Sequence, residues 1–345
     1  MYLKIKLFAF ITTFLLTVSA CAAQEDKLIF AIDVIRHGDR TPITEIPQDP
    51  HQWHEGLGQL TALGMLQEYH LGESLRKRYV EEKKLLPTHY EVQTVHIRSS
   101  DYDRTLMSAE ALLLGLYPLG TGPQLPNGTM ALPSAYQPIP IHTVDRHNDT
   151  LFLSSEELRE QLERYVFTRP DWKQKTAELQ PQFARWSQLT GINIHSLHQL
   201  ISLGDTLLVR KLHKIPLPSG ITEEDEKTLI EVRDWGQATY YKSADFATLS
   251  TAALLKKINE YLELARQHQT KLKYVLFSGH DGTILGLLGA MHLPQDKTPT
   301  YASDLNFSLY ETPASTTVLK ITLNGELITV PHCGKVICSK KIEYS

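Results

Sequence analysis

Two short polar clusters, more than two hundred residues apart, hold the side chains best suited to chemistry. The first is residues 36–42, with the sequence RHGDRTP, and the second is the pair His280-Asp281. Guanidinium groups match phosphate oxygens in geometry and charge, and Arg98 would add a third arginine to the two in the first cluster. Because arginines gathered at one point repel each other, such a cluster is tolerated when an anion neutralises it. We therefore expect a phosphate-binding site.

His37 is the candidate nucleophile of this site. Positive neighbours disfavour the imidazolium form, so a histidine among arginines stays neutral more readily. A neutral imidazole can attack phosphorus and form a covalent intermediate. Arginines then supply the positioning and charge neutralisation that phosphoryl transfer needs, without a metal ion.

The leaving oxygen needs a proton donor, and Asp281 is the only acid in the second cluster. His280 would be an additional partner of the oxyanion. Because a carboxylic acid has an ordinary pKa of about 4, activity should fall toward neutral pH unless the site raises the pKa of Asp281.

Three further residues allow more than one interpretation. Gly38 lets the backbone pack closely, and Asp39 either caps a turn or pairs with an arginine. Arg104, in the sequence DRT at 103–105, is either a further phosphate ligand or, as we favour, a member of a buried salt bridge. Other histidines lack the spacing of metal ligands, so no metal site is predicted. These are His51, His54, His70, His142 and His147.

The elements that position the clusters are strands buried on both faces. The apolar run 28–35 leads into the first cluster, 92–97 leads into the third arginine, and 274–277 leads into the second cluster. Chemistry just beyond the C-terminal ends of buried strands is the usual arrangement in open α/β sheets. Helical periodicity at 57–80 and 106–116 alternates with the first two strands. We predict an α/β fold whose shared sheet brings the clusters together.

Residues 146–265 have a different character. Capping signals at Ser154 and Thr222 indicate helix starts, an amphipathic stripe ends the segment, and no convincing strand run occurs. A helical cap beside the C-terminal edge of a sheet would form one wall of the cleft and select substrate. We predict an α/β core made of 24–145 and 266–345, with 146–265 inserted as a mainly helical cap.

The part of the chain after the second cluster returns to strands. A short helix is predicted at 283–291 and strands at 305–310 and 317–323. Asn324-Gly325 between β-rich runs is a strong β-hairpin signal.

Composition excludes several classes of protein. The chain has 345 residues, 42% hydrophobic and 21% charged, which argues against disorder and against a multi-span membrane protein. Its length corresponds to about two structural units and allows a large core without disulfides or metal. With 35 Lys and Arg against 39 Asp and Glu the net charge is −4, so non-specific nucleic-acid binding is not expected.

Residues 1–23 have the order of a secretory signal peptide: Lys4 and Lys6, then a mainly apolar stretch of twelve residues, then small residues. The apolar stretch is too short to span a bilayer comfortably, and a retained anchor helix is the less favoured alternative. Cleavage after Ala23 would remove both lysines, take the net charge from −4 to −6, and leave a soluble periplasmic or secreted protein. The sequence ending at Cys21 also resembles a bacterial lipobox, so an outer-membrane lipoprotein is the competing interpretation. Membrane association is expected only if Cys21 is lipidated.

Two cysteines remain once Cys21 is removed or lipidated, Cys333 and Cys338. In an oxidising compartment we expect them to close a small disulfide loop. A zinc role is not expected, because two cysteines alone cannot complete a tetrahedral zinc site.

These motifs resemble the histidine acid phosphatase branch of the histidine phosphatase superfamily. The arginine and proline after RHG in residues 36–42 separate this branch from the phosphoglycerate mutases. The sequence looks most similar to prostatic-type and lysosomal-type acid phosphatases over most of the mature chain, and least so in the helical region. The other matching segments are 53–79, 97–109, 137–143, 280–281 and 301–303.

The resemblance implies an exported acid phosphatase that hydrolyses phosphomonoesters, with a phosphohistidine on His37 and Asp281 as proton donor. It implies a mixed, mainly parallel sheet flanked by helices, like that of phosphoglycerate mutases, with an α-helical cap. No metal or cofactor is expected, small phosphomonoesters or phosphotyrosine-type molecules would be the substrates, and a homodimer would be consistent with the family. The implied phosphate ligands are Arg36, Arg40, Arg98 and His280.

Two features depart from the family pattern. Gly282 follows the His-Asp pair where threonine is common, which would loosen the loop but leave the pair intact. The animal enzymes carry several disulfides, of which only the C-terminal one would be matched here, by Cys333 and Cys338. Few cysteines and a bacterial-type signal suggest a bacterial exported form.

Other functions make distinct predictions. A phytase-like phosphatase is weakened by the His-Asp pair, which stands in place of a His-Ala-Glu type motif. A non-catalytic protein that binds phosphate or lipid headgroups is weakened by the intact His37 and Asp281. A mutase would depend on a bisphosphorylated cofactor, and a metallophosphatase would lose activity in chelator.

Overall fold

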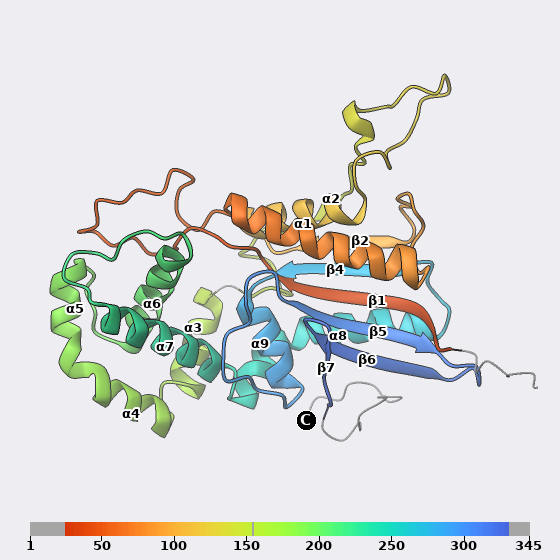
Figure 1. Ribbon diagram of the computed structural model, residues 1–345. Helices are drawn as coiled ribbons and strands as arrows, with labels where there is room; N and C mark the ends of the chain where they lie inside the picture. Colours follow the sequence, from red (N-terminus) through yellow and green to blue (C-terminus); the bar gives the residue numbers. More distant parts are fainter. Residues whose placement is uncertain (1–24, 154, 331–345) are drawn as a thin grey trace, which may run out of the picture.

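The computed structural model describes residues 25–153 and 155–330 (Figure 1). At its centre is a seven-stranded sheet in the order β3-β2-β4-β1-β5-β6-β7. The strands from β3 to β1 pair in parallel, whereas β5, β6 and β7 are antiparallel. This confirms the predicted mixed sheet, in which the central strands are mostly parallel. The strands are β1 (Lys27–Arg36), β2 (Val95–Ser99), β3 (Ile141–His142), β4 (Tyr274–Gly279), β5 (Asp304–Glu311), β6 (Thr317–Leu323) and β7 (Glu326–Leu327).

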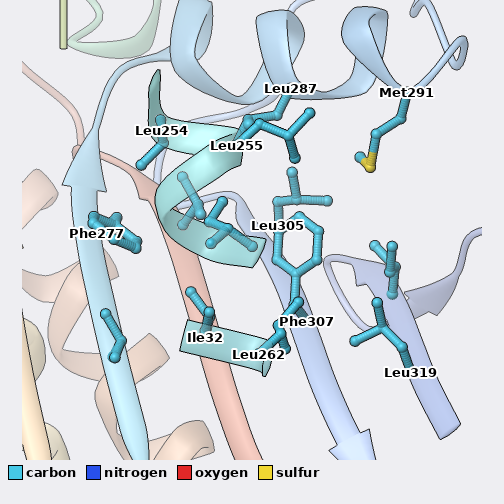
Figure 2. Packing of buried hydrophobic residues seen from close by; sticks show 14 of the residues in the cluster. Ile32, Leu254, Leu255, Leu262, Phe277, Leu287, Met291, Leu305, Phe307 and Leu319 are labelled. Atoms are coloured by element: carbon cyan, nitrogen blue, oxygen red, sulfur yellow. The ribbon is translucent and has the colours of Figure 1, made fainter. Parts of the chain in front are cut away.

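The sheet is buried on both faces, which explains the continuous apolar run of β1. Alternate residues of a strand point to opposite faces, so Ala31 and Ile35 join one apolar cluster while Ile32 and Val34 join the other. The first face packs on α1 (Ala62–Arg76) and α2 (Asp103–Leu116), and the second packs on α8 (Ala244–Arg266) and α9 (Asp281–Ala290). Figure 2 shows Ile32, Phe277 and Phe307 of adjacent strands beneath leucines of α8 and α9.

Five further helices form a separate apolar cluster beyond the end of the sheet toward which β4 points (Figure 1). This is the C-terminal end of the parallel strands, so these helices stand beside the predicted chemistry. Thr222 caps one of them with a reciprocal capping box to Asp225, as its sequence predicts. The five are α3 (Ser155–Tyr165), α4 (Pro170–Leu179), α5 (Phe183–Thr190), α6 (Leu197–Leu212) and α7 (Glu223–Tyr240).

The position of α8 bears on the limits of the cap. All of this helix except its last residue lies inside the predicted insertion 146–265, but Leu254, Leu255 and Leu262 pack on the sheet with β1 and β4 (Figure 2). We therefore propose that the cap comprises residues 146–243 and that α8 belongs to the core.

Element boundaries differ from the sequence prediction at a few points. The strand expected from residue 92 begins at Val95, because 92–94 form a turn. The helix expected over 57–80 begins at Ala62 and ends in a π-helical turn, Lys77–Glu82. Asn324 and Gly325 both have positive φ and join β6 to β7, so the hairpin is confirmed. Short 3₁₀ turns occur at Pro133–Ala135 and Gln180–Gln182.

Several sequence predictions lie outside the described residues. They concern the signal peptide at 1–23, the lipobox cysteine Cys21, the cap at Ser154, and the pair Cys333 and Cys338. Over the part of the chain that is described, none of the helices combines the length and the hydropathy that crossing a membrane requires.

Candidate active site

The structure brings the two polar clusters together at the ends of neighbouring strands. β1 and β4 are parallel and in register, with Arg36 opposite Gly279. The backbone N–H of His37 donates to the carbonyl of Gly279 at 3.0 Å. The rings of His37 and His280 consequently lie 5.6 Å apart, centroid to centroid, at 74° to each other.

His37 is almost completely buried and is held in one tautomer. Its Nδ1 lies 2.8 Å from the carbonyl oxygen of Gly38, which can only accept, so Nδ1 carries the proton and Nε2 keeps its lone pair. Burial first, and then the charges of Arg104, Arg36 and Arg40, hold the pKa of His37 well below its ordinary value. The result is a neutral imidazole with a free nucleophilic nitrogen.

Close backbone packing fixes the loop that carries His37. The N–H of Gly38 donates to Ser108 Oγ on α2 at 3.1 Å. A Cβ atom at Gly38 would overlap the backbone of Gly64 on α1, and one at Gly64 would overlap the backbone of Asp39. Both positions therefore require glycine, which agrees with the close approach predicted for Gly38.

A pocket of about 340 Å³ opens over these residues. Its charged lining consists of Arg40, Arg104, Asp205 and Asp281, next to His37 and His280. Most of the remaining wall is apolar or aromatic and comes from the cap, from α8 and from the loop before α3. Apolar members of this wall are Ile43, Leu151, Phe152, Leu158, Leu162, Ile201, Tyr240, Tyr241 and Phe246.

Arg36 and Arg40 are both buried and both paired with carboxylates. Arg36 Nη2 lies 3.1 Å from Asp281 Oδ2, and its guanidinium group stacks over the ring of Tyr301 at 4.1 Å. Arg40 Nη1 lies 2.9 Å from Asp205 Oδ2, on α6 of the cap. The structure therefore places both arginines beside His37, with cap and core carboxylates as counter-ions.

Asp281 is the first residue of α9 and lines the pocket. Its Oδ2 is near two guanidinium groups, at 3.1 Å from Arg36 and 3.7 Å from Arg233 of α7. Burial opposes ionisation, but Arg36, Arg233 and Arg40 outweigh it and hold the pKa of this carboxyl group below its usual range. Without substrate, Asp281 is thus a carboxylate.

His280 also lines the pocket, as a neutral imidazole. Its Nε2 lies 3.0 Å from Ser100 Oγ, and its Nδ1 lies 3.5 Å from Arg104 Nη2. Burial and the positive charge of Arg104 lower the pKa of His280 to about 3.

Arg98 is not brought to the pocket, in contrast to the prediction. Its Nη2 forms a buried ion pair with Asp149 Oδ2 at 2.5 Å, and the guanidinium group lies over the ring of Phe152. The reason is strand parity. Ile97 faces α1 and α2, so its neighbour Arg98 points to the other face of the sheet, among residues that secure the cap connection.

Arg104 takes the place that the sequence analysis gave to Arg98. The salt bridge favoured for it is wrong: among the described residues no carboxylate lies within ion-pair distance of its guanidinium group. Arg104 instead stacks on Tyr102 at 4.5 Å and lines the pocket. Burial, and then Arg40, lowers its pKa to about 10. The feature of the sequence that pointed to Arg104 is the segment DRT, at the start of the helix that follows β2.

Two other residues have roles that the structure makes specific. Among the described residues, Asp39 forms an ion pair with none of the arginines. Its Oδ2 accepts from Thr61 Oγ1 and contacts His213 Nε2, each at 2.6 Å, which ties the loop to α1 and to the cap. A Cβ atom at Gly282 would collide with the hydroxyl of Tyr241. The glycine after the His-Asp pair is therefore matched to an aromatic side chain that lines the pocket.

The charges of the site do not cancel. Four guanidinium groups face three carboxylates, those of Asp205, Asp234 and Asp281, and both histidines are neutral. A net positive charge remains, which favours the binding of an anion such as a phosphate group. The guanidinium groups are those of Arg36, Arg40, Arg104 and Arg233.

Sequence comparison relates the chain to known phosphatases. A family model described as the histidine phosphatase superfamily, branch 2, matches residues 27–324. Bovine (Bos taurus) lysosomal acid phosphatase is 33% identical over 328 residues, which cover 90% of this chain and 75% of the relative. Human (Homo sapiens) prostatic acid phosphatase is 34% identical over 307 residues, with coverages of 86% and 76%.

Comparison with solved structures gives the same fold. Klebsiella sp. ASR1 phytase superposes with a TM-score of 0.66 at 17% identity, over 87% of this chain and 83% of that one. Hafnia alvei phytase in complex with myo-inositol hexakis sulphate gives a TM-score of 0.62 at 18% identity, with coverages of 88% and 85%. At these identities the likeness concerns the fold alone.

Proposed function

The chain belongs to branch 2 of the histidine phosphatase superfamily, and on that premise we propose that it is an acid phosphatase that hydrolyses phosphomonoesters through a phosphohistidine on His37. The observation that carries the proposal is the state of this side chain. It is a neutral imidazole with Nδ1 engaged by Gly38, in a pocket that also holds Arg40 and Arg104.

In this proposal the phosphate group is held by Arg40, Arg104 and His280 at the pocket, and by Arg36 at its floor. Arg104 is the strongest addition to the ligands inferred from sequence, because its charge has no carboxylate partner among the described residues. An oxyanion would supply that missing partner. Arg98 is replaced in this set, since its charge is used by Asp149.

The first chemical step forms a bond from His37 Nε2 to phosphorus and breaks the bond from phosphorus to the ester oxygen. The leaving oxygen takes a proton from the carboxyl group of Asp281 and departs as an alcohol. Positive charge that develops on the imidazole is stabilised through Nδ1–H, which donates to Gly38.

The second step hydrolyses the phosphohistidine. The Asp281 carboxylate takes a proton from a water molecule as its oxygen attacks phosphorus, and the bond to Nε2 breaks. Asp281 is protonated at the end of this step, and it ionises again once inorganic phosphate has left. The arginines bind and stabilise the phosphoryl oxygens in both steps, and they transfer no proton themselves.

The protonation of Asp281 is coupled to substrate binding in this scheme. A phosphate dianion competes for the guanidinium groups that hold Asp281 ionised, and adds negative charge nearby, so binding raises the pKa of this carboxyl group. Turnover should be fastest at acidic pH and fall as the bound complex loses this proton.

The test is His37→Ala assayed with an aryl phosphate at acidic pH. We expect kcat/KM to fall by roughly three orders of magnitude or more, because the covalent route is lost. Rapid quenching of the unmodified enzyme with labelled substrate should trap a phosphoenzyme that is stable in alkali and labile in acid, as a phosphoramidate is. The matched control is His89→Ala at an exposed histidine. Turnover by His37→Ala near that of the control would reject the nucleophile.

A phytase-like activity is the second candidate, and the pocket wall weighs against it. The cationic residues that line the pocket, Arg40 and Arg104, are needed for one phosphate, and the wall beyond them is mainly apolar. We expect an aryl phosphate to be hydrolysed in preference to inositol hexakisphosphate in parallel assays. We also propose, from the sequence of residues 1–23 alone, that the protein is exported to the periplasm or secreted.

A further inference from the structure

A chain of alternating charges runs from the cap into the active site. Asp205 on α6 pairs with Arg40 at 2.9 Å and with Arg233 on α7 at 3.5 Å. Arg233 in turn lies 3.7 Å from Asp281, which pairs with Arg36 at 3.1 Å. Two cap residues, Asp205 and Arg233, thus connect Arg40 to the proposed proton donor.

The packing of α6 on α7 fixes this arrangement. A Cβ atom at Gly204 would overlap the carbonyl group of Leu229, so the two helices approach as closely as backbone allows. That approach places Asp205 and Arg233 side by side, at 7% and 2% exposure. Arg233 is further held by Asp234 at 2.6 Å, so its guanidinium group has little freedom to turn away.

Arg233 differs from the other arginines in what its charge reaches. The arginines that act most strongly on His37 are Arg104, Arg36 and Arg40. Arg233 is not among the residues that line the pocket, and its nearest reactive neighbour is Asp281. Its most direct effect on the reaction is therefore through that carboxyl group.

We propose that Arg233 is a positioning residue which, balanced by Asp205, keeps Asp281 ionised until a phosphate dianion enters and so sets the upper pH limit of turnover. This inference rests on the proposed function, because it requires Asp281 to be the proton donor. It assigns to the cap a part in the chemistry of the core, in addition to its place in the pocket wall.

Charged or titratable groups from several elements face Asp281, and their signs decide the direction of the effect. Arg36 and Arg233 are the two guanidinium groups within ion-pair distance of it among the described residues. Of these, Arg36 also acts on the nucleophile, so Arg233 is the cation that can be removed with least effect elsewhere. The groups are Arg36 (β1), Arg40 (loop after β1), Arg104 (α2), Arg233 (α7), Tyr241 (α7–α8 connection) and the neighbouring His280. Asp205 (α6) acts on Asp281 through its ion pairs with Arg40 and Arg233.

The test compares the pH dependence of kcat for Arg233→Gln and Arg233→Lys with that of the unmodified enzyme. Saturating β-glycerophosphate is the substrate, because kcat reports ionisation in the enzyme–substrate complex and an alkoxide leaving group depends on the donor. Removing a positive charge this close should move the alkaline limb of kcat upward by roughly one pH unit or more. Arg233→Lys should keep the limb near its original position.

Asp205→Asn gives a second variant with the opposite sign. It removes a negative charge that offsets Arg233, so the alkaline limb should move to lower pH, and free phosphate should inhibit more strongly because Arg40 loses its counter-ion. The matched control is Arg185→Gln, which breaks the ion pair to Asp225 at the N-terminal end of the same helix α7 and touches no charge of the site. Its alkaline limb should not move.

The outcomes separate this inference from the proposed function. Arg233→Gln with normal turnover and an unmoved limb overturns the inference and leaves the phosphohistidine route standing. A limb that persists in Asp281→Asn overturns both the donor assignment and the inference. If Arg185→Gln shifts the alkaline limb as Arg233→Gln does, displacement of α7 is the cause of the shift, and this inference is overturned. Should Arg233→Gln fail to fold, the opposite shift in Asp205→Asn decides the question.

Discussion

Arg98 and Arg104 lie six residues apart in the sequence, but their guanidinium groups have different partners in the structure. Arg98 neutralises the buried Asp149, whereas Arg104 extends along the ring of Tyr102 to the pocket. A charge whose partner is a fixed carboxylate contributes to folding. A charge with no carboxylate partner among the described residues is available to a ligand. The two residues should therefore respond to the same substitution in different assays.

We predict that Arg104→Gln lowers kcat/KM by roughly 10²-fold or more, as loss of one charged donor to a phosphoryl oxygen does, with little change in thermal unfolding. Arg98→Gln should instead cost about 3–5 kcal/mol of stability, because it leaves Asp149 buried without its partner. Steady-state kinetics and denaturant unfolding of both variants check this. If Arg98→Gln lost activity and Arg104→Gln lost stability, Arg98 and not Arg104 would be the phosphate ligand.

At the scale of elements, two glycine contacts hold α1, and they should have separable effects. Gly64 meets the backbone of Asp39 in the nucleophile loop, whereas Gly72 meets the backbone of Leu112 on α2. Both changes to alanine overpack a rigid contact, which typically costs about 1–3 kcal/mol.

Gly64→Ala should lower kcat as well as stability, because the loop that carries His37 must move away from α1. Gly72→Ala should lower stability alone and serves as the matched control. Unfolding curves and kcat of the two variants test this prediction. Equal losses of kcat at matched stability would mean that the loop is not held by α1.

The same elements show what the sequence can and cannot predict. A strand buried on both faces has a continuous apolar sequence, so β1, β4 and the polar clusters at their ends can be predicted. The capping residue Thr222 likewise predicts the start of α7. Asp205 and Arg233 cannot be predicted, because a single charged residue on an amphipathic helix has the pattern of a solvated face. Their meeting depends on the approach of α6 to α7 and of both helices to the sheet. The apolar run before Arg98 predicts a strand but does not show which of its residues face which layer, so the sequence alone cannot place Arg98.

For the whole molecule, buried carboxyl groups predict how stability depends on pH. Glu68 on α1 is fully buried, and neither carboxyl oxygen has a hydrogen-bond partner among the described residues. Burial raises its pKa well above the ordinary 4.5. Burial likewise raises the pKa values of Asp33 and Asp304, which lie nearby in β1 and β5.

A carboxyl group whose pKa is higher in the folded state binds more protons there, so its stabilising effect is full below the ordinary pKa and is lost as pH rises toward the folded value. We therefore predict that the free energy of unfolding falls from about pH 4.5 upward, by about 1.4 kcal/mol per pH unit for each such group within its window. Asp205 and Asp281 have lowered pKa values and act in the opposite sense, below their ordinary value of 3.8.

The measurement is urea unfolding across pH 4 to 8. Glu68→Gln should flatten the decline, because the side chain keeps its shape and no longer titrates, while Glu110→Gln at an exposed position of α2 should not. A wild-type profile that rises over this range would contradict the assignment of Glu68 as a buried acid.

The order of strands in the sheet has a consequence for biogenesis. β1 is made first, but its two neighbours, β4 and β5, lie more than two hundred residues later, and β5 ends at Glu311. A ribosome must therefore finish nearly the whole polypeptide before the hydrogen-bonding edges of this apolar segment can be covered. Such long-range pairing folds slowly and leaves a nascent chain open to aggregation. A chaperone that binds residues 27–36 during synthesis should therefore reduce aggregation of the nascent chain.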